Sequence, residues 1–495
     1  MNVPLVITAA IVAVTVLVGS AARRRRGTMD LEEWTVAGRS FGGVFLWVLA
    51  AGEIYTSFTF LGAAGYAYEN GGPALYILGY GALAYIISFF LLPPLWRYAK
   101  RHRLVTQSDY FAHRFDSPWL GVLTAAVGVV FVVPYADEQL EGLGAIVSAV
   151  THRAVSQSVA MVISFGLVAF FVLLAGLRSA AWTSVIKDVL LIGVVLAVGI
   201  YLPVKYFGGF SGVVHALNRV HPGQLALPGS SAGLGVPWFV STLLLTSMGF
   251  YMYPQAFLAT YSARSAKAIR RNAMFLPLYQ ILLLLMLFVG FTAVLVVPGL
   301  KGAATNSALL ALVGKAGPSW LLGLVGGAGA LAAMVPTAAI VLAAASLIGR
   351  NVYQGVIRPQ ASGASVLLVS RAFVLVIMAV ALLFAIADPA AIVNLLLTSY
   401  DGVTQFFPAV LLSLLWRRVS KWGAGAGLLV GVGLVLYLVI SGHDPLWGIN
   451  AGLVALAANA VVTVAVTALR PAHPAADVLD RYAPQPSVAA PTAAR

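Results

Sequence analysis

Long apolar runs, separated by short loops that contain charged residues, Gly or Pro, constrain this chain more than any other feature. About 20 consecutive apolar residues suffice for an α-helix to cross the hydrocarbon core of a bilayer. The runs therefore predict an all-α polytopic membrane protein with thirteen transmembrane spans. The predicted spans are 3–21, 43–68, 73–96, 118–149, 157–176, 179–203, 237–261, 274–298, 318–348, 366–387, 390–415, 422–441 and 446–468.

Composition excludes several classes of protein. Only 9% of the 495 residues are charged and 60% are hydrophobic, whereas soluble domains carry about 25% charged residues. The spans leave little room for a nucleotide-binding domain, and the sequence contains no Walker motif. With no cysteine and no metal-ligand spacing among the seven histidines, thiol chemistry and a histidine metal centre are excluded. We therefore expect neither an enzyme nor a cofactor.

Positive charge is concentrated in alternate loops, which explains the net charge of +14 without nucleic acid. Cytoplasmic loops are enriched in Lys and Arg, so the pattern predicts an inner-membrane protein with its N-terminus outside and its C-terminus in the cytoplasm. The basic loops contain Arg23–Arg26, Arg97–Arg103, Arg178, Arg264–Arg271, Arg350 with Arg358, Arg417–Lys421, and Arg470.

The two ends of the chain differ in character. Residues 1–26 form an apolar run followed by a basic loop. Because the charges follow the run instead of preceding it, they favour a retained helix over a signal peptide. Residues 469–495 are rich in Ala and Pro and predict a disordered cytoplasmic tail.

Two spans contain residues that a continuous helix disfavours. Residues 50–59 (AAGEIYTSFT) include Gly52 and Glu53, and residues 246–255 (TSMGFYMYPQ) include Gly249 and Pro254. The spacing fits two inverted repeats of five helices, each beginning with a broken helix. Gly and Pro are also common in unbroken membrane helices, which leaves that alternative open. The predicted repeats are 38–203 and 237–416, followed by two peripheral spans at 422–468.

Three segments resemble the sodium/solute symporter family, and most of all its bacterial monocarboxylate permeases, which carry lactate, pyruvate and related acids. They are GRSFGGVFLWVLAAGEIYTSFTFLGAAGYAYENGG, YPQAFLATYSARSAKAIRRNAMFLPLY and AAMVPTAAIVLAAASLIGRNVY. The resemblance extends from about Gly38 to about Trp416. It implies a LeuT-like five-plus-five fold with one extra N-terminal helix, and alternating access driven by a cation gradient.

Few ionisable side chains lie at membrane depth, where each costs about 2.5–3.5 kcal/mol and is a functional candidate. Lys187 is the one clear intramembrane cation in the sequence, and Glu53, Asp188 and Asp401 are the acids that we assign with it to ion coupling. A structural pair between Lys187 and Glu53 or Asp401 is the alternative. A further group of acids lies in span 4 and would line an outward vestibule: Asp137, Glu138 and Glu141.

The resemblance implies a sodium site made from oxygens of spans 2 and 9, which fall on Gly52, Tyr55, Ala333 and Thr337 in this sequence. Two positions depart from the family pattern. Pro336 replaces a serine, and Ser184 replaces an acid in the pattern WTD. Lys187 follows Ser184 by one helical turn, so its ammonium would lie near the vacated cation position.

Such an ammonium would repel sodium. At about 5 Å and an effective dielectric near 20, the repulsion is of the order of 3 kcal/mol, enough to weaken sodium binding about a hundredfold. The sequence therefore favours H⁺ over Na⁺ as the coupling ion, with Na⁺ as the alternative.

Substrate contacts are expected at the two breaks, because the N-terminus of a half-helix presents free N–H groups and a positive dipole that suit a carboxylate. Interhelical packing is the alternative role for the tyrosines. The candidates are Tyr55, Thr56, Ser57 and Thr59 of span 2, Gln139 of span 4, and Ser247, Tyr251 and Tyr253 of span 7.

Together these features predict a symporter in the lipid bilayer that imports a small monocarboxylate with a proton. The alternatives are a sodium-coupled symporter of another small organic solute, and an uncoupled channel or sensor built on the same fold.

Overall fold

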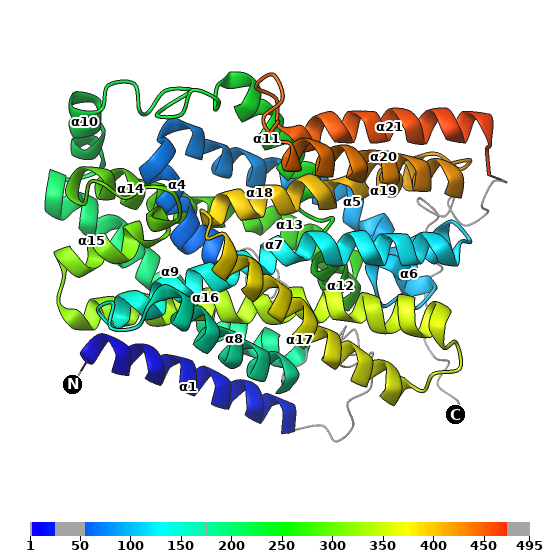
Figure 1. Ribbon diagram of the computed structural model, residues 1–495, viewed down its shortest axis with the longest axis horizontal. Helices are drawn as coiled ribbons and strands as arrows, with labels where there is room; N and C mark the ends of the chain where they lie inside the picture. The colour runs from blue at the N-terminus through cyan, green and yellow to red at the C-terminus, as the bar shows by residue number, and fades with distance from the viewer. Residues whose placement is uncertain (1, 25–54, 175–176, 473–495) are drawn as a thin grey trace, which may run out of the picture.

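The computed structural model describes residues 2–24, 55–174 and 177–472, and in these ranges it contains helices and no β-strand. Nine of the described helices are long and apolar enough to cross a membrane. Three shorter apolar helices accompany them, at Val3–Gly19, Gln157–Leu173 and Val236–Gly249. The predicted all-α membrane architecture is thus confirmed. The long helices α7, α16, α20 and α21 run along the longest axis of the molecule (Figure 1).

The first part of the chain contains long helices and several short ones. Its elements are α1 (Val3–Arg24), η2 (Phe58–Gly62), α4 (Ala63–Asn70), η3 (Gly72–Leu75), α5 (Tyr76–Arg101), α6 (Gln107–Arg114), α7 (Pro118–Val150), α8 (Gln157–Leu174), α9 (Leu177–Phe207) and α10 (Phe210–Val220). Of these, α6 and α10 lie between the predicted spans. The sequence did not reveal them because they are too short to give a membrane-length apolar run.

The second part has more interruptions. Its elements are α11 (Val236–Gly249), α12 (Pro254–Ser262), α13 (Ala266–Phe275), η4 (Leu276–Tyr279), α14 (Gln280–Val296), η5 (Gly302–Ser307), α15 (Ala308–Ala316), α16 (Ser319–Ser346), η6 (Leu347–Ile357), α17 (Gly363–Ala387), α18 (Ile392–Val403), η7 (Thr404–Phe406), α19 (Phe407–Leu415), α20 (Lys421–Ile440) and α21 (Ala451–Leu469).

Several boundaries differ from the predicted ones. The final span begins at Ala451 and not at residue 446, because Asn450 caps the helix by accepting a hydrogen bond from the N–H of Leu453. The span predicted at 318–348 continues to Ile357 as a π-helix. The span predicted at 390–415 is divided by the 3₁₀ turn η7.

The Gly- and Ala-rich helix α16 forms the centre of the fold, with 94% of its most apolar stretch buried. It packs against α1, α7, α9 and α17. Small residues permit this close approach: a Cβ on Gly329 would lie only 2.8 Å from Ile146 and 2.9 Å from Phe60. This core holds α7 and α9 beside the first break.

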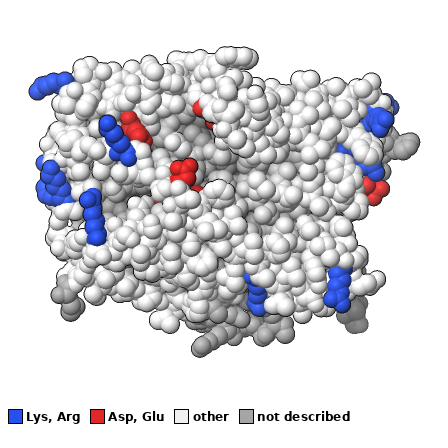
Figure 2. Space-filling view, in the orientation of Figure 1, with Lys and Arg blue, Asp and Glu red and all other residues white. Residues whose placement is uncertain are grey.

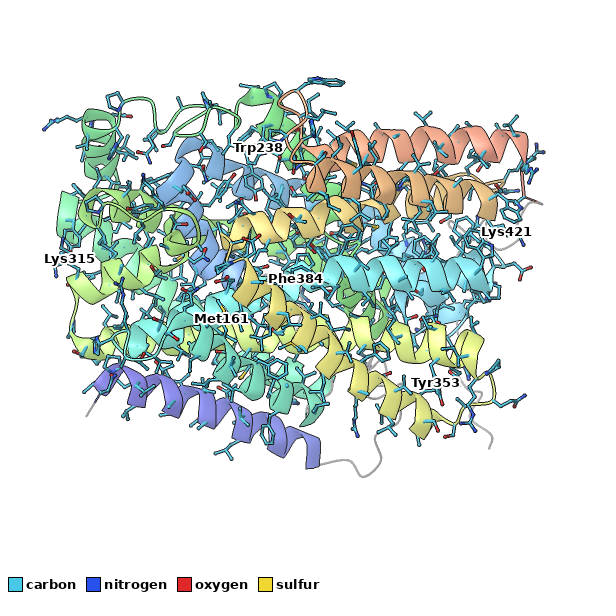
Figure 3. The ribbon with its side chains drawn as sticks, viewed as in Figure 1. Met161, Trp238, Lys315, Tyr353, Phe384 and Lys421 are labelled. Carbon is cyan, nitrogen blue, oxygen red and sulfur yellow. The ribbon has the colours of Figure 1, made fainter. Side chains whose placement is uncertain are left out.

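Most of the Lys and Arg side chains on the face shown in Figure 2 lie toward the two ends of the long axis. The face between them is largely uncharged, apart from a few acidic side chains and a basic one near its lower edge. Lys315 of α15 lies at one end, and Tyr353 of η6 and Lys421 of α20 lie at the other (Figure 3). This distribution suits a protein whose long axis crosses a membrane.

Candidate functional site

The second break separates α11 from α12, at the position predicted from the sequence. Helix α11 ends at Gly249 and α12 begins at Pro254, where a proline suits the first helical turn because its missing N–H needs no partner there. The break is anchored by α6, since Gln107 Nε2 donates a hydrogen bond of 2.6 Å to the carbonyl of Met252.

The described part of the first break begins at Tyr55, and Gly52 and Glu53 lie outside the described residues. Thr59 Oγ1 accepts a hydrogen bond from the N–H of Thr56 and donates one to the carbonyl of the same residue, both at 3.0 Å. Thr59 therefore satisfies main-chain groups at the start of the helix.

Two side chains of α7 accept hydrogen bonds from the N–H groups of the two residues that follow Thr56. Gln139 Oε1 accepts from the N–H of Ser57 at 3.2 Å, and Glu138 Oε1 accepts from the N–H of Phe58 at 2.8 Å. The sequence assigned these N–H groups to a substrate carboxylate. In the structure a carboxylate and an amide of the protein itself hold them.

Lys187 of α9 reaches the same break from another side. Its fully buried ammonium donates a hydrogen bond of 2.9 Å to the carbonyl of Tyr55 and lies 3.3 Å from Asp188 Oδ1. The acid beside Lys187 is therefore its neighbour Asp188. The ammonium is thus hydrogen-bonded to a carbonyl that, according to the family resemblance, would bind sodium.

The predicted sodium ligands of α16 bond to each other. Thr337 Oγ1 donates a hydrogen bond of 2.6 Å to the carbonyl of Ala333, one turn earlier in the same helix. Both residues are buried, and α16 contacts η2 and α9. Helix α16 thus packs against both η2, which follows the first break, and α9, which carries Lys187.

A cavity extends from the second break along α12 and α13, with room of about 60 Å³ for water-sized molecules. Two predicted substrate residues, Tyr251 and Tyr253, lie in its wall. The full lining is Ser88, Leu92, Tyr135, Phe250, Tyr251, Tyr253, Gln255, Ala256, Ala259, Thr260, Ile269, Asn272, Ala273 and Tyr400.

Two amide side chains of this cavity are not among the predicted substrate residues. Gln255 Oε1 and Asn272 Oδ1 are buried and have no hydrogen-bond partner among the described residues. Gln255 directly follows the proline that starts α12, and Asn272 directly follows the basic segment Arg264–Arg271, which predicted a loop, so neither residue gave a signal of a binding site. Amide groups of this kind can donate to a carboxylate and accept from a hydroxyl.

Aromatic rings connect the cavity with the neighbouring helices. The ring centroid of Tyr253 lies 5.0 Å from that of Tyr135 and 5.2 Å from that of Tyr400. The hydroxyl of Tyr253 donates to Ser399 Oγ at 3.0 Å, and that of Tyr55 donates to the carbonyl of Tyr279 at 2.7 Å. These tyrosines therefore pack between helices, and Tyr253 also faces the cavity.

Other predicted residues lie outside the cavity lining. Ser247 donates from its hydroxyl to the carbonyls of Leu243 and Tyr80 within the helix bundle. Asp401 of α18 is fully buried beside the start of α21, where a Cβ on Gly452 would come within 2.5 Å of Asp401 Oδ1. Ser184 is buried on α9.

The acids predicted to line a vestibule are buried. Asp137, Glu138 and Glu141 of α7 have at most 3% of their surface exposed. Glu141 Oε2 accepts from Gln157 Nε2 of α8 at 2.8 Å, whereas Glu138 contacts the first break. Among the described residues, no three His, Asp or Glu side chains form a group able to hold a metal ion.

Residues 34–431 match the model of the sodium:solute symporter family. The chain is 43% identical over 478 residues to the uncharacterized symporter YhjB of Bacillus subtilis (strain 168), covering 94% of this chain and 97% of that protein. It is 30% identical over 479 residues to a monocarboxylate transport permease protein of Rhizobium johnstonii, covering 93% and 95% of the two chains.

A solved structure of a Na⁺-coupled sialic acid symporter, in a substrate-bound outward-open state, superposes with a TM-score of 0.78. The superposition covers 96% of this chain and 99% of that chain, at 17% sequence identity. This likeness concerns the fold alone, and it confirms the LeuT-like architecture that the resemblance implied.

Proposed function

The chain belongs to the sodium:solute symporter family and is a multi-pass secondary transporter of small solutes, not an enzyme; from this premise we propose that it imports a small monocarboxylate together with a proton. Lactate and pyruvate represent the proposed class of substrate. The proposal has two parts, the coupling ion and the solute, and different residues support each.

The observation that carries proton coupling is the ammonium of Lys187 on the carbonyl of Tyr55. While the amine is protonated, its positive charge beside that carbonyl opposes the binding of a second cation. Pro336 offers no hydroxyl, and the Thr337 hydroxyl already donates to Ala333. When the amine of Lys187 gains or loses a proton, the net charge at the break changes by one unit without any metal ion. A coupled transporter needs such a change in charge between its loaded and empty states.

The cavity at the second break supports a small substrate. A water molecule needs roughly 10–15 Å³ of such space, so about 60 Å³ suits a three-carbon acid better than a sugar. The amides of Gln255 and Asn272 supply hydrogen bonds, and the tyrosines enclose the apolar part of the molecule. The name of the Rhizobium relative agrees with this class of solute.

Sodium coupling to another small organic solute is the second candidate, and the family favours it. Ala333 and Thr337 offer two oxygens one turn apart on α16, which contacts η2, and Tyr55 and Gly52 would add carbonyls from the segment before η2. An uncoupled channel would use the same cavity without accumulating solute.

For the organisation of the chain we propose two inverted repeats, 38–203 and 237–416, flanked by the N-terminal helix and by peripheral spans at 422–468. The interruption between α11 and α12 falls near the start of the second repeat, where a broken helix is expected, and this supports the division. We place the protein in the inner membrane with the basic loops in the cytoplasm.

The experiment that tests the proposed function is uptake of radiolabelled lactate by purified protein in proteoliposomes, with protein-free liposomes as the control for passive diffusion. We expect pyruvate, acetate and propionate to compete, and glucose to have no effect. Accumulation above the external concentration would exclude a channel. Competition by glucose without competition by any short acid would overturn the assignment of the substrate class.

A further inference from the structure

Glu138 is a buried carboxylate that the sodium and substrate sites described above do not use. Its Oε1 accepts from the N–H of Phe58 at 2.8 Å, from Gln139 Nε2 at 2.9 Å and from Thr56 Oγ1 at 3.4 Å. Its Oε2 is buried and has no hydrogen-bond partner among the described residues. One oxygen thus carries the contacts of the carboxylate, and the other has none.

This geometry is that of an anionic ligand at the start of a helix. The N–H groups there carry partial positive charge and favour an anion. The helical segment that begins here continues through η2 into α4, and no part of Glu138 reaches solvent. A side chain from α7, 80 residues away in sequence, therefore fills the position that would suit the carboxylate of a solute.

We propose that Glu138 is the resident anion of the first break, and that the carboxylate of a transported solute replaces it on the N–H of Phe58 while Glu138 takes up one proton from water. The inference rests on the proposed monocarboxylate substrate. The exchange balances charge: the solute brings one negative charge, and the added proton converts the carboxylate of Glu138 to a neutral acid. Binding of the solute and binding of the proton are then linked at one residue.

The linkage follows from the electrostatics of a buried site. Two carboxylates that share a small buried space cannot both remain ionised. A carboxylate displaced from its three donors would be an unpaired buried charge, since Oε2 has no partner that could compensate. Protonation removes that penalty and lets the neutral side chain leave the helix start.

The charged and titratable groups around Glu138 come from several elements. Asp137 of α7, Tyr76 and Tyr80 of α5, and Tyr253 of the second break interact with it electrostatically. From α18, the ring of Tyr400 meets that of Tyr80 edge to face, with centroids 6.1 Å apart, and Asp401 is close enough to interact electrostatically with Tyr253. From α9, Lys187 contacts the carbonyl of Tyr55, one residue before Thr56.

The test is the binding of radiolabelled lactate to the purified full-length protein between pH 6 and pH 8, with Glu138→Gln as the variant. The glutamine keeps an oxygen that can accept from Phe58 but cannot carry charge. In the unaltered protein we expect affinity to rise as pH falls, by up to about tenfold per pH unit, the limit for one linked proton. In E138Q we expect affinity at pH 8 at least tenfold higher, with no dependence on pH.

Glu141→Gln is the matched control, since Glu141 lies on the same helix and bonds to Gln157 of α8. We expect it to retain the pH dependence of lactate binding. Lactamide, which has no carboxylate, should bind the unaltered protein independently of pH. Thermal unfolding of each variant checks that it is folded.

The proposal is overturned if folded E138Q keeps the pH dependence of the unaltered protein, or if E141Q loses it. Failure of the proposed function gives a different result. If lactate does not bind at any pH, the substrate class is wrong. If lactate binds with the expected dependence on Glu138 but uptake responds only to sodium, the coupling ion is wrong and the role of Glu138 stands.

Discussion

Two opposite charges meet the backbone of the first break within a few residues. Lys187 binds the carbonyl of Tyr55, and Glu138 binds the N–H of Phe58. Each main-chain group has the polarity that its charged partner requires. The residues come from α9 and α7, so the break holds charges from two helices that α16 packs together.

We predict that Lys187→Ala lowers accumulation of lactate at least tenfold, because the variant removes the exchangeable charge from the break. Lys205→Ala is the control, since Lys205 lies on the same helix and also donates to a carbonyl, that of Ala316. Uptake into proteoliposomes measures both. Restored accumulation in the double variant Lys187→Ala/Asp188→Ala would show that Lys187 only balances Asp188.

We predict that Gln255→Leu raises the KM for lactate roughly twofold to tenfold, since a hydrogen bond between the amide and the hydroxyl of the solute contributes about 0.5–1.5 kcal/mol. Gln354→Leu, which removes an amide that bonds to the carbonyl of Ala361 far from the cavity, should leave KM unchanged. Initial uptake rates at varied lactate concentration give both values. An unchanged KM in Q255L would remove Gln255 from the substrate site.

At the scale of elements, the features that could be predicted from the sequence are those that depend on neighbouring residues in the chain. The second break was predicted because Gly249 and Pro254 interrupt an apolar run, and the structure places the helix ends at these residues. Lys187 was placed near the first break by its helical spacing from Ser184. The contact of Glu138 with Phe58 left no such signal, because it depends on how two helices pack.

A substitution at Gly249 tests how tightly the second break packs against α18 and η7. A Cβ at this position would lie 2.1 Å from Thr404 Oγ1 and 2.9 Å from the ring of Tyr400. We predict that Gly249→Ala destabilises the protein by about 1–3 kcal/mol and slows transport. Gly433→Ala is the control, because no atom lies within 4 Å of its added Cβ. Thermal unfolding compares the two, and equal midpoints would contradict the packing argument.

At the scale of the whole molecule, hydropathy and charge were sufficient to predict the helical membrane fold, while the resemblance supplied its LeuT-like class. The resident side chains of the first break, and the cavity amides Gln255 and Asn272, required the three-dimensional structure. An apolar run of membrane length predicts where a single helix crosses the membrane. Sites between helices depend on contacts between distant parts of the sequence.

The orientation in the membrane can be tested because the chain contains no cysteine. Ala232 lies in the exposed loop before α11, and Gln360 lies in the exposed basic loop before α17. We predict that a membrane-impermeant maleimide applied to intact cells labels Ala232→Cys and not Gln360→Cys, and that permeabilisation exposes both. The reverse pattern would invert the proposed topology.

Proton-coupled import is the central claim, and uptake driven by imposed ion gradients in proteoliposomes tests it most directly. With choline replacing sodium and the outside more acidic, we predict lactate accumulation that increases as external pH falls and disappears with a protonophore. Protein-free liposomes give the background of passive entry. Uptake that requires millimolar sodium at constant pH, and does not respond to a proton gradient, would contradict the claim.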